Sequence, residues 1–515
     1  MKRILALVMC VFMAAGLFAG CEGGQEEKQK LGDVTFDSFA VGYAKADITP
    51  DPESQIMLAG NNDHTTRLST RVQEPLWANC IAFTDTDGTT VLLFGMDLHG
   101  TAEGITDAVR AAVEEQTGIP GSHIQFNASH THSAPSTGYS AIPAVRRSDE
   151  NIVQKCIETA LAALESRKPA KMYLTFVRTE NMNFVRHYLK KDGTYVGTGA
   201  GDIADEELLG HMEAADNLMQ LVKFTREGEK DVVLINYQGH PVSPTRDQYY
   251  TAISSQNVGV MRRVLLEKAD VESIYILGGS GDSGHGSVIA SEVRYAGYKE
   301  HGTALADMAI AAFDTFREAE TGKIHFTSQK FDVDGWKFEL GAWGFGDLGF
   351  VTEPFEAFQT NAMAVRENAP YYMTIYASIA NGNPHAGYLP DAKALTYEIY
   401  ETKAMFTPPG TAEIIEAELT NMLQKVFDES GQEEKQKAEG YIMDHSPKPD
   451  GFTYKVTEQS VAYEVKNKHY HVRLDLNGNM TTLLVRDKAL AEEILKQSTV
   501  KLLFDERYVA VEIDK

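Results

Sequence analysis

Two histidines stand two residues apart at the end of an apolar segment, His130 and His132 in the run Asn-Ala-Ser-His-Thr-His-Ser. In an extended chain, residues two apart point to the same side, so both imidazoles can face one metal ion or one substrate. His240 follows a second apolar run, 232–237. Imidazole is a common zinc ligand and a common general acid or base. The three residues therefore predict a metal site, with histidines hydrogen-bonded to backbone near loops as the alternative.

The composition limits what can complete such a site. Four cysteines in 515 residues are too few and too scattered for a thiolate metal site, so an ion would be held by histidine and oxygen. Hydrophobic residues make up 43% of the chain and charged residues 23%, which is typical of a globular protein. The formal net charge of −25 repels phosphate backbones, so no nucleic-acid partner is expected.

The elements that must position these histidines are short apolar runs alternating with helical patterns. The runs predict buried strands at 47–49, 90–97, 123–128, 232–237 and 273–278, and the helical patterns lie at 105–117, 151–166 and 258–268. The alternation predicts an α/β fold with a large mixed sheet core, helices around it and mostly parallel strands. Ligands of such sheets bind beyond the carboxyl ends of the strands, where the three histidines stand.

The C-terminal part of the chain has a different pattern. Residues 428–440 are charged and contain at 431–437 the same heptad found at 24–30, and both segments are expected to be solvated linkers. Runs that alternate like strands follow, at 452–456, 461–465, 469–475, 481–485 and 508–513, with one helix near 489–497. The expected organisation is a linker at 22–35, a main domain at 36–427, a linker at 428–440 and a small β-rich domain at 441–515.

The N-terminus has the features of an export signal. Lys2 and Arg3 precede an apolar run at 4–17 that is too short to span a bilayer permanently. The run ends in Leu-Phe-Ala-Gly-Cys21, which resembles a bacterial lipobox whose cysteine is acylated after cleavage. We therefore expect residues 1–21 to be a lipoprotein signal peptide and the protein to be exported to the bacterial cell surface or envelope, anchored to the membrane through a lipid on Cys21.

Several motifs occur together in a recognisable order. They are Asp-Ile-Thr-Pro at 47–50, Asn-Ala-Ser-His-Thr-His-Ser at 127–133, Asn-Tyr-Gln-Gly-His-Pro at 236–241, Gly-Ser-Gly-Asp at 279–282 and Ala-Asn-Gly-Asn-Pro-His-Ala-Gly-Tyr at 380–388. In order and approximate spacing the chain resembles the neutral/alkaline (non-lysosomal) ceramidase family over roughly residues 40–425. The resemblance implies a zinc amidase domain on an α/β scaffold, with one zinc ion per chain.

The resemblance also implies a ligand set. Two histidines, a glutamate and a tyrosine hold the ion in this family, and the matching positions are His130, His240, Glu353 and Tyr388. Glu356 is only three residues from Glu353 and remains the alternative carboxylate.

The expected catalytic residues lie in the same motifs. His132 is placed to donate to a developing oxyanion or to relay a proton to the leaving amine. Arg186 matches a family arginine near the site, and a solvated surface arginine is the alternative. Tyr400, followed by a glutamate, matches a further active-site tyrosine, and Tyr397 is the alternative.

The chain departs from the family where a serine is expected. Gly284 occupies the serine position, so Ser283 or His285 could take its place, or the group could be dispensable. We include Ser283 among the expected catalytic residues.

These observations predict a zinc-dependent hydrolase of an N-acyl (amide) linkage that uses metal-activated water. Its expected substrate is ceramide, another N-acyl lipid or another small N-acyl molecule. An esterase or deacetylase with the same zinc site, acting on a small or glycan substrate, and a non-catalytic surface lipoprotein that binds a ligand, are the alternatives.

Overall fold

The computed structural model describes most of the chain after the expected signal peptide. The described residues are 29–60, 66–197, 204–241, 250–289, 297–382, 387–391, 393–396, 399–437, 446–465, 469–505 and 509–514, together with residues 292, 295 and 441. The expected signal peptide, Cys21 and Tyr397 lie outside them. Among the described residues, no helix is long and apolar enough to cross a membrane.

A large mixed sheet forms the centre of the main domain, with the strand order β14-β12-β11-β6-β1-β3-β4-β5 and β16 paired to β6. Its strands are β1 (Ala40–Asp47), β3 (Trp77–Thr84), β4 (Thr90–Met96), β5 (Ile124–Ala128), β6 (Lys168–Arg178), β11 (Leu218–Arg226), β12 (Val232–Tyr237), β14 (Glu272–Leu277) and β16 (Arg317–Ala319). The expected strands after residue 90 match β4, β5, β12 and β14, whereas 47–49 lies at the end of β1.

The expectation of mostly parallel strands is wrong. Within this sheet only the pairs β12–β14 and β4–β5 are parallel among the described strands. The strands β3 and β4 are joined by a tight turn at Asp85–Thr89, in which Gly88 has a φ of +87°. Such a short connection forces neighbouring strands to run antiparallel, because a parallel pair needs a crossover of a dozen or more residues.

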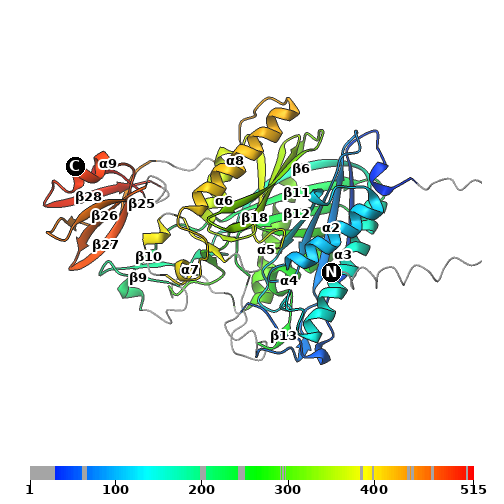
Figure 1. Ribbon diagram of the computed structural model, residues 1–515, viewed down its shortest axis with the longest axis horizontal. Helices are drawn as coiled ribbons and strands as arrows, with labels where there is room; N and C mark the ends of the chain where they lie inside the picture. The colour runs from blue at the N-terminus through cyan, green and yellow to red at the C-terminus, as the bar shows by residue number, and fades with distance from the viewer. Residues whose placement is uncertain are drawn as a thin grey trace, which may run out of the picture.

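The main domain is built in four layers (Figure 1). Helices α2 (Glu103–Thr117), α3 (Pro143–Glu165), α4 (Gln256–Ala269) and α5 (Tyr298–Ala311) cover one face of the large sheet. A second sheet packs on its other face and is covered in turn by α6 (Gln359–Asn368) and α8 (Thr411–Ser430). The strands of the second sheet are β17 (His325–Val333), β18 (Trp336–Phe345), β19 (Leu348–Thr352) and β21 (Met373–Ala377).

Strand β4 illustrates why the sequence folds into layers. Leu92 and Phe94 contact the helices, while Val91 and Leu93 lie between the two sheets. Because successive strand residues face opposite sides, a strand buried on both faces is apolar throughout rather than alternating. Each such side chain contributes about 1.5–3 kcal/mol when it is fully buried.

The two edges of the large sheet come close to each other. A Cβ added at Gly95 of β4 would lie 2.6 Å from the carbonyl oxygen of Tyr275 in β14. The amide of Leu277, at the end of β14, donates to Oδ1 of Asn127 in β5 over 2.8 Å. The carboxyl ends of both parallel pairs therefore meet, and the histidine-bearing loops begin there.

Short strands surround this meeting point. They are β2 (Arg71–Val72), β13 (Ala252–Ile253), β7 (Phe184–Val185), β15 (Ser283–Gly284), β8 (Tyr188–Lys190), β9 (Tyr195–Val196), β10 (Leu208–His211), β20 (Glu356–Ala357) and β22 (Tyr388–Leu389), with the one-turn helix α7 (Tyr400–Lys403).

A separate β-rich region follows, as expected (Figure 1). It contains β23 (Lys448–Pro449), β24 (Tyr454–Lys455), β25 (Val461–Val465), β26 (His469–Leu476), β27 (Asn479–Val485), α9 (Lys488–Ile494), β28 (Thr499–Phe504) and β29 (Ala510–Asp514). It contacts the main domain at β9, where the hydroxyls of Tyr195 and Thr481 lie 2.6 Å apart.

Residues 431–437, between the two regions, are largely exposed but contact the main domain. Helix α8 continues to Ser430, and Lys435 forms ion pairs with Asp347 and Glu320 of the main domain. Tyr441 is only 3% exposed and lies in the core between the two sheets, where its hydroxyl contacts the backbone of Thr374. Lys435 and Tyr441 therefore both contact the main domain.

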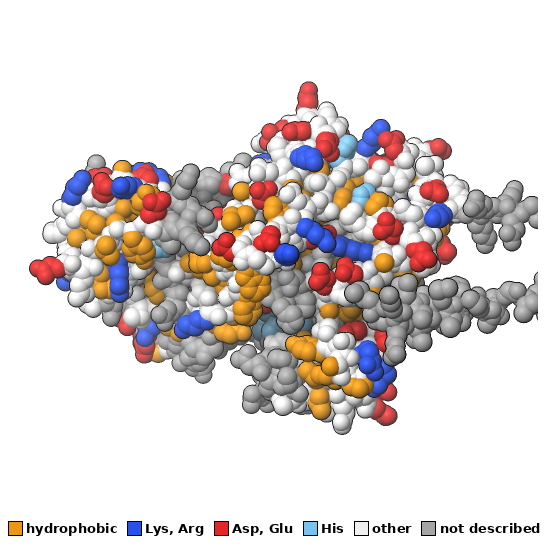
Figure 2. Space-filling view, in the orientation of Figure 1, with side chains coloured by type: hydrophobic (Ala, Val, Ile, Leu, Met, Phe, Trp, Pro, Cys, Tyr) orange, Lys and Arg blue, Asp and Glu red, His pale blue; other side chains and the backbone are white. Residues whose placement is uncertain are grey.

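The molecular surface has no single dominant charge on the face seen in Figure 2, where acidic and basic side chains are interspersed.

Candidate metal centre

His130 stands directly after β5 in a strained backbone conformation. Its φ is +63°, a region that non-glycine residues rarely adopt and that tends to occur at functional sites. The backbone is held there because the amide of His130 donates to the carbonyl of Leu98 over 2.8 Å. Nδ1 of His130 donates to the carbonyl of His99 over 2.7 Å, which leaves the lone pair on Nε2.

His240 stands after β12, at the other parallel pair. Its Nδ1 lies 3.3 Å from the carbonyl oxygen of Ser280, which again leaves the lone pair on Nε2. Burial lowers the pKa of His240 well below its usual value, so the ring is neutral near pH 7. A neutral imidazole is the form that binds metals.

His132 completes the group that the His-x-His motif predicts. Its Nε2 lies 3.1 Å from Nε2 of His240, and the two rings are edge-to-face. Burial also lowers the pKa of His132 well below its usual value. The loop that carries it is held by Arg67, whose Nη1 donates to the carbonyl of His132 over 2.7 Å. Both histidines of the motif therefore face the same space as His240.

Glu356 supplies a carboxylate to this space. One ligand atom each of His130, His240 and Glu356 lie within 4.8 Å of one another. Oε2 of Glu356 is 3.3 Å from Nε2 of His130 and is buried without a hydrogen bond. Burial acts to raise the pKa of Glu356, but the neighbouring His130 outweighs it and lowers that pKa to about 2. An ionised carboxylate thus lies beside the two imidazoles.

Glu353, the carboxylate that the sequence favoured, is not part of this group. Its side chain is fully buried, its Oε2 accepts a hydrogen bond from the amide of Phe355 over 2.7 Å, and burial raises its pKa well above the usual value. The strand β19 ends at Thr352, and the chain turns before Glu356 begins β20. This turn places Glu356, and not Glu353, beside the histidines.

Tyr388 lies beside Glu356, because the two residues are register partners in the parallel pair β20–β22. Its hydroxyl lies 3.1 Å from Nη2 of Arg186. Burial and then the Glu356 carboxylate raise the pKa of Tyr388 well above its usual value. The arrangement brings a phenol next to the His–Glu group.

Arg186 is largely enclosed, with 14% of its side chain exposed. Its Nε donates to Oε1 of Glu401 over 2.8 Å, and its Nη2 donates to the carbonyl of Gly281 over 2.6 Å. Glu401 is fully buried and also contacts His187 over 3.0 Å. The guanidinium is thus fixed beside Tyr388.

Tyr400 lies at the edge of the same group. Its ring is edge-to-face with Tyr388, with centroids 5.7 Å apart, and it is 43% exposed. It begins the one-turn helix α7, next to the buried Glu401. Tyr400 can therefore contact a bound molecule and solvent at once.

The hydroxyl of Ser283 is engaged in a hydrogen bond with the backbone. Its Oγ is buried and donates to the carbonyl of Gln238 over 2.7 Å. The neighbouring Gly284 faces open space, because a Cβ added there would meet only Cδ of Arg186, at 3.9 Å. His285 is half-buried, and its removal from water lowers its pKa to about 3. The geometry brings Arg186 to the site but gives Ser283 no catalytic contact.

Sequence reasoning missed His99. It follows β4 as His130 follows β5, and the centroids of the two rings are 4.1 Å apart. The parallel pairing of β4 and β5 could have indicated it, since neighbouring parallel strands end at the same edge of the sheet.

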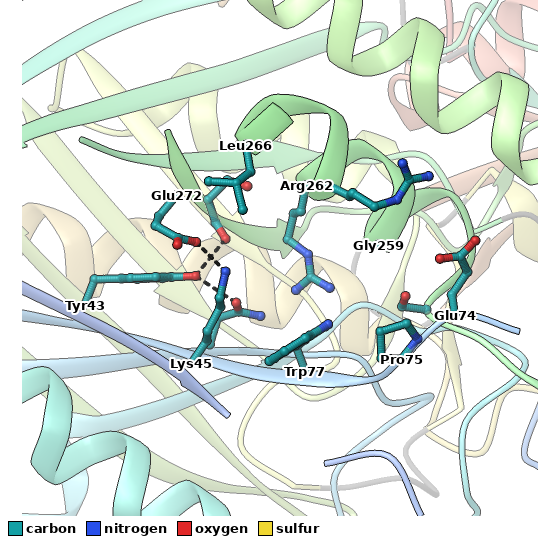
Figure 3. Close-up of a pocket in the computed structure, with 13 residues that line it drawn as sticks. Tyr43, Lys45, Glu74, Pro75, Trp77, Gly259, Arg262, Leu266 and Glu272 are labelled. Atoms are coloured by element: carbon teal, nitrogen blue, oxygen red, sulfur yellow. Dashed lines mark hydrogen bonds and ion pairs between the residues drawn. The ribbon is translucent and has the colours of Figure 1, made fainter. Parts of the chain in front are cut away.

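A cavity of about 190 Å³ lies between β1, β3 and α4 (Figure 3). Tyr43, Trp77 and Arg262 line it, from β1, β3 and α4. Arg262 forms a buried ion pair with Asp97, and the carboxylate of Asp97 also accepts a hydrogen bond from the amide of Trp77 over 2.9 Å. The ion pair fixes Asp97, at the start of the segment 97–99. The carbonyls of Leu98 and His99 in this segment accept hydrogen bonds from His130.

No protein-family model and no curated protein matches the sequence. Two solved structures match the fold with 13% identity. One is the neutral ceramidase from Pseudomonas aeruginosa, with a TM-score of 0.62 over 85% of this chain and 84% of that chain. The other is described as a ceramidase complexed with C2, with a TM-score of 0.61 over 87% of this chain and 89% of that chain. The chain therefore has a neutral ceramidase-like fold.

Proposed function

We propose that this protein is a zinc-dependent hydrolase of an N-acyl linkage, with ceramide or a related N-acyl lipid as its substrate. The observation that carries the proposal is the convergence of His130, His240 and Glu356 within 4.8 Å at the meeting point of the sheet edges. The neutral ceramidase-like fold supports amide hydrolysis and a lipid substrate.

The donor set fits zinc. Catalytic zinc sites use three protein ligands of nitrogen and oxygen and leave a further position open. Here two imidazoles have Nδ1 committed to backbone carbonyls, at 2.7 Å for His130 and 3.3 Å for His240, and the buried Oε2 of Glu356 lacks a hydrogen bond. Hydrogen bonds from the other ring nitrogen to a carbonyl orient the rings of zinc ligands. Tyr388, the fourth expected ligand, is the neighbour of Glu356.

Bound zinc would supply a water of lowered pKa and would polarise a carbonyl oxygen. The protein's own residues would transfer the proton and position the phenol of Tyr388. His132, neutral and 3.1 Å from His240, is placed to accept a proton and return it to the leaving amine. Arg186 donates to the Tyr388 hydroxyl and holds this phenol in place.

His130→Ala and His240→Ala are each expected to lower zinc content and turnover by at least about 100-fold, because mutation of outer-shell partners alone costs zinc sites about 10–100-fold. Fatty-acid release from a short-chain fluorescent ceramide measures turnover. His325→Ala, in β17 of the second sheet, is the control and should retain both zinc and turnover.

Two results would contradict the proposal in different ways. Turnover of an ester but not of the matching amide would favour the esterase or deacetylase alternative. A zinc-loaded protein that binds the lipid without releasing product would favour a binding lipoprotein.

We also propose export and lipid anchoring at Cys21. The basic start, the short apolar run and the lipobox-like end support it. Cells that express the full-length chain with radiolabelled palmitate should label the wild type and not Cys21→Ser. Equal labelling of the two proteins would refute acylation at this cysteine.

A further inference from the structure

We infer that the same cleft contains a second, imidazole-only position for a divalent cation, formed by His99, His130 and His132 and suited to copper. One ring nitrogen of each lies within 4.8 Å of the others. The inference concerns the histidine cluster and does not depend on amide hydrolysis.

Two parallel strands bring the three rings together. His99 follows β4, while His130 and His132 follow β5. The ring centroid of His99 lies 4.1 Å from that of His130 and 5.1 Å from that of His132. The ring centroids of His130 and His132 are also 5.1 Å apart. The strand pairing therefore fixes this group as firmly as the first.

The backbone around His99 is anchored on both sides. Asp97 is 1% exposed and is held by the buried ion pair with Arg262. The carbonyl of His99 itself accepts the hydrogen bond from Nδ1 of His130. The loop that carries the added imidazole is thus tied both to α4 and to a ligand of the first position.

The donor chemistry differs between the two positions. The first combines two imidazoles with the Glu356 carboxylate, whereas the second offers imidazoles alone. Imidazole sites suit copper as well as zinc, and divalent copper binds nitrogen donors more tightly than zinc does. Copper is therefore the cation with which we test the position containing His99.

The two positions cannot be filled together. His130 belongs to both groups, and its Nδ1 already donates to the His99 carbonyl over 2.7 Å. Only Nε2 is left, so His130 can coordinate one ion at a time. Copper bound at the second position would withdraw His130 from His240 and Glu356, and copper should displace zinc rather than bind beside it.

Electron paramagnetic resonance of the full-length protein loaded with one equivalent of Cu²⁺ tests the inference. Hyperfine couplings should report three imidazole nitrogens in the wild type and two in His99→Asn. The substitution keeps the backbone carbonyl that holds His130. His325→Asn is the matched control and should retain three nitrogens.

Two further measurements keep the result unambiguous. One equivalent of copper should release one equivalent of zinc from the wild type, and Glu356→Gln should retain the three-nitrogen copper signal. A copper signal unchanged by His99→Asn, or copper and zinc bound together, would overturn the inference.

If His99→Asn fails to fold, anomalous diffraction from crystals of the copper-loaded wild type locates the copper ion. An anomalous peak between the rings of His99, His130 and His132 supports the position, and a peak beside His240 and Glu356 refutes it. Zinc bound at His240 and Glu356 tests the proposed function separately.

Discussion

Glu356→Gln is expected to lower zinc affinity by more than about 100-fold, whereas Glu353→Gln should leave it within about twofold of the wild type. Glu356 is an ionised carboxylate 3.3 Å from the Nε2 of His130, and its pKa is lowered to about 2. An amide oxygen carries no charge and is a poorer zinc ligand. Competition with a chromophoric chelator measures the affinity of each variant.

Glu353→Gln is a control of matched chemistry, three residues away. Burial raises the pKa of Glu353 well above its usual value and so favours the neutral carboxyl. Glutamine has nearly the same shape and retains an oxygen that can accept the hydrogen bond from the amide of Phe355. The opposite result, with zinc lost in Glu353→Gln and kept in Glu356→Gln, would restore the assignment that the sequence favoured.

The sequence located the histidines of the site because the signals were local. His130 and His240 each follow an apolar run, and both runs are strands of the large sheet. Ligand sites lie beyond the carboxyl ends of parallel strands, and the two parallel pairs meet at this point. The ends of individual strands could thus be predicted even though the overall strand directions were not.

Contacts between distant segments could not be predicted in this way. The choice between Glu353 and Glu356 depends on where the chain turns after β19, and a spacing of three residues does not reveal it. Arg186 forms a hydrogen bond with Glu401, which lies 215 residues further along the chain. The open space at Gly284 depends on the position of the Arg186 side chain. Such features come from packing, which a single sequence does not encode in any local pattern.

The segment after α8 illustrates the same limit. Its charged residues indicated a solvated linker, yet the core between the two sheets accepts Tyr441, which is 3% exposed. A buried tyrosine ring removes about 150–250 Å² of surface from water. The burial of Tyr441 is thus a contact that charge content does not reveal.

Arg186→Met is expected to lower the free energy of unfolding by about 3–5 kcal/mol, because it leaves a buried carboxylate without its main partner. Glu401 is fully buried and accepts the hydrogen bond from Nε of Arg186 over 2.8 Å. The exposed pair Lys155–Glu158 is the control, and Lys155→Met should cost less than about 1 kcal/mol. Urea unfolding monitored by circular dichroism measures both variants.

The double variant Arg186→Met/Glu401→Met separates stability from function at this pair. Replacing both buried charges by apolar side chains is often neutral or stabilising, so the double variant should recover most of the lost stability. Turnover should remain low, because Arg186 also holds the Tyr388 hydroxyl at 3.1 Å and methionine cannot donate to it. If the double variant regained turnover together with stability, Arg186 would be a structural residue, and Tyr388 would keep its position without this hydrogen bond.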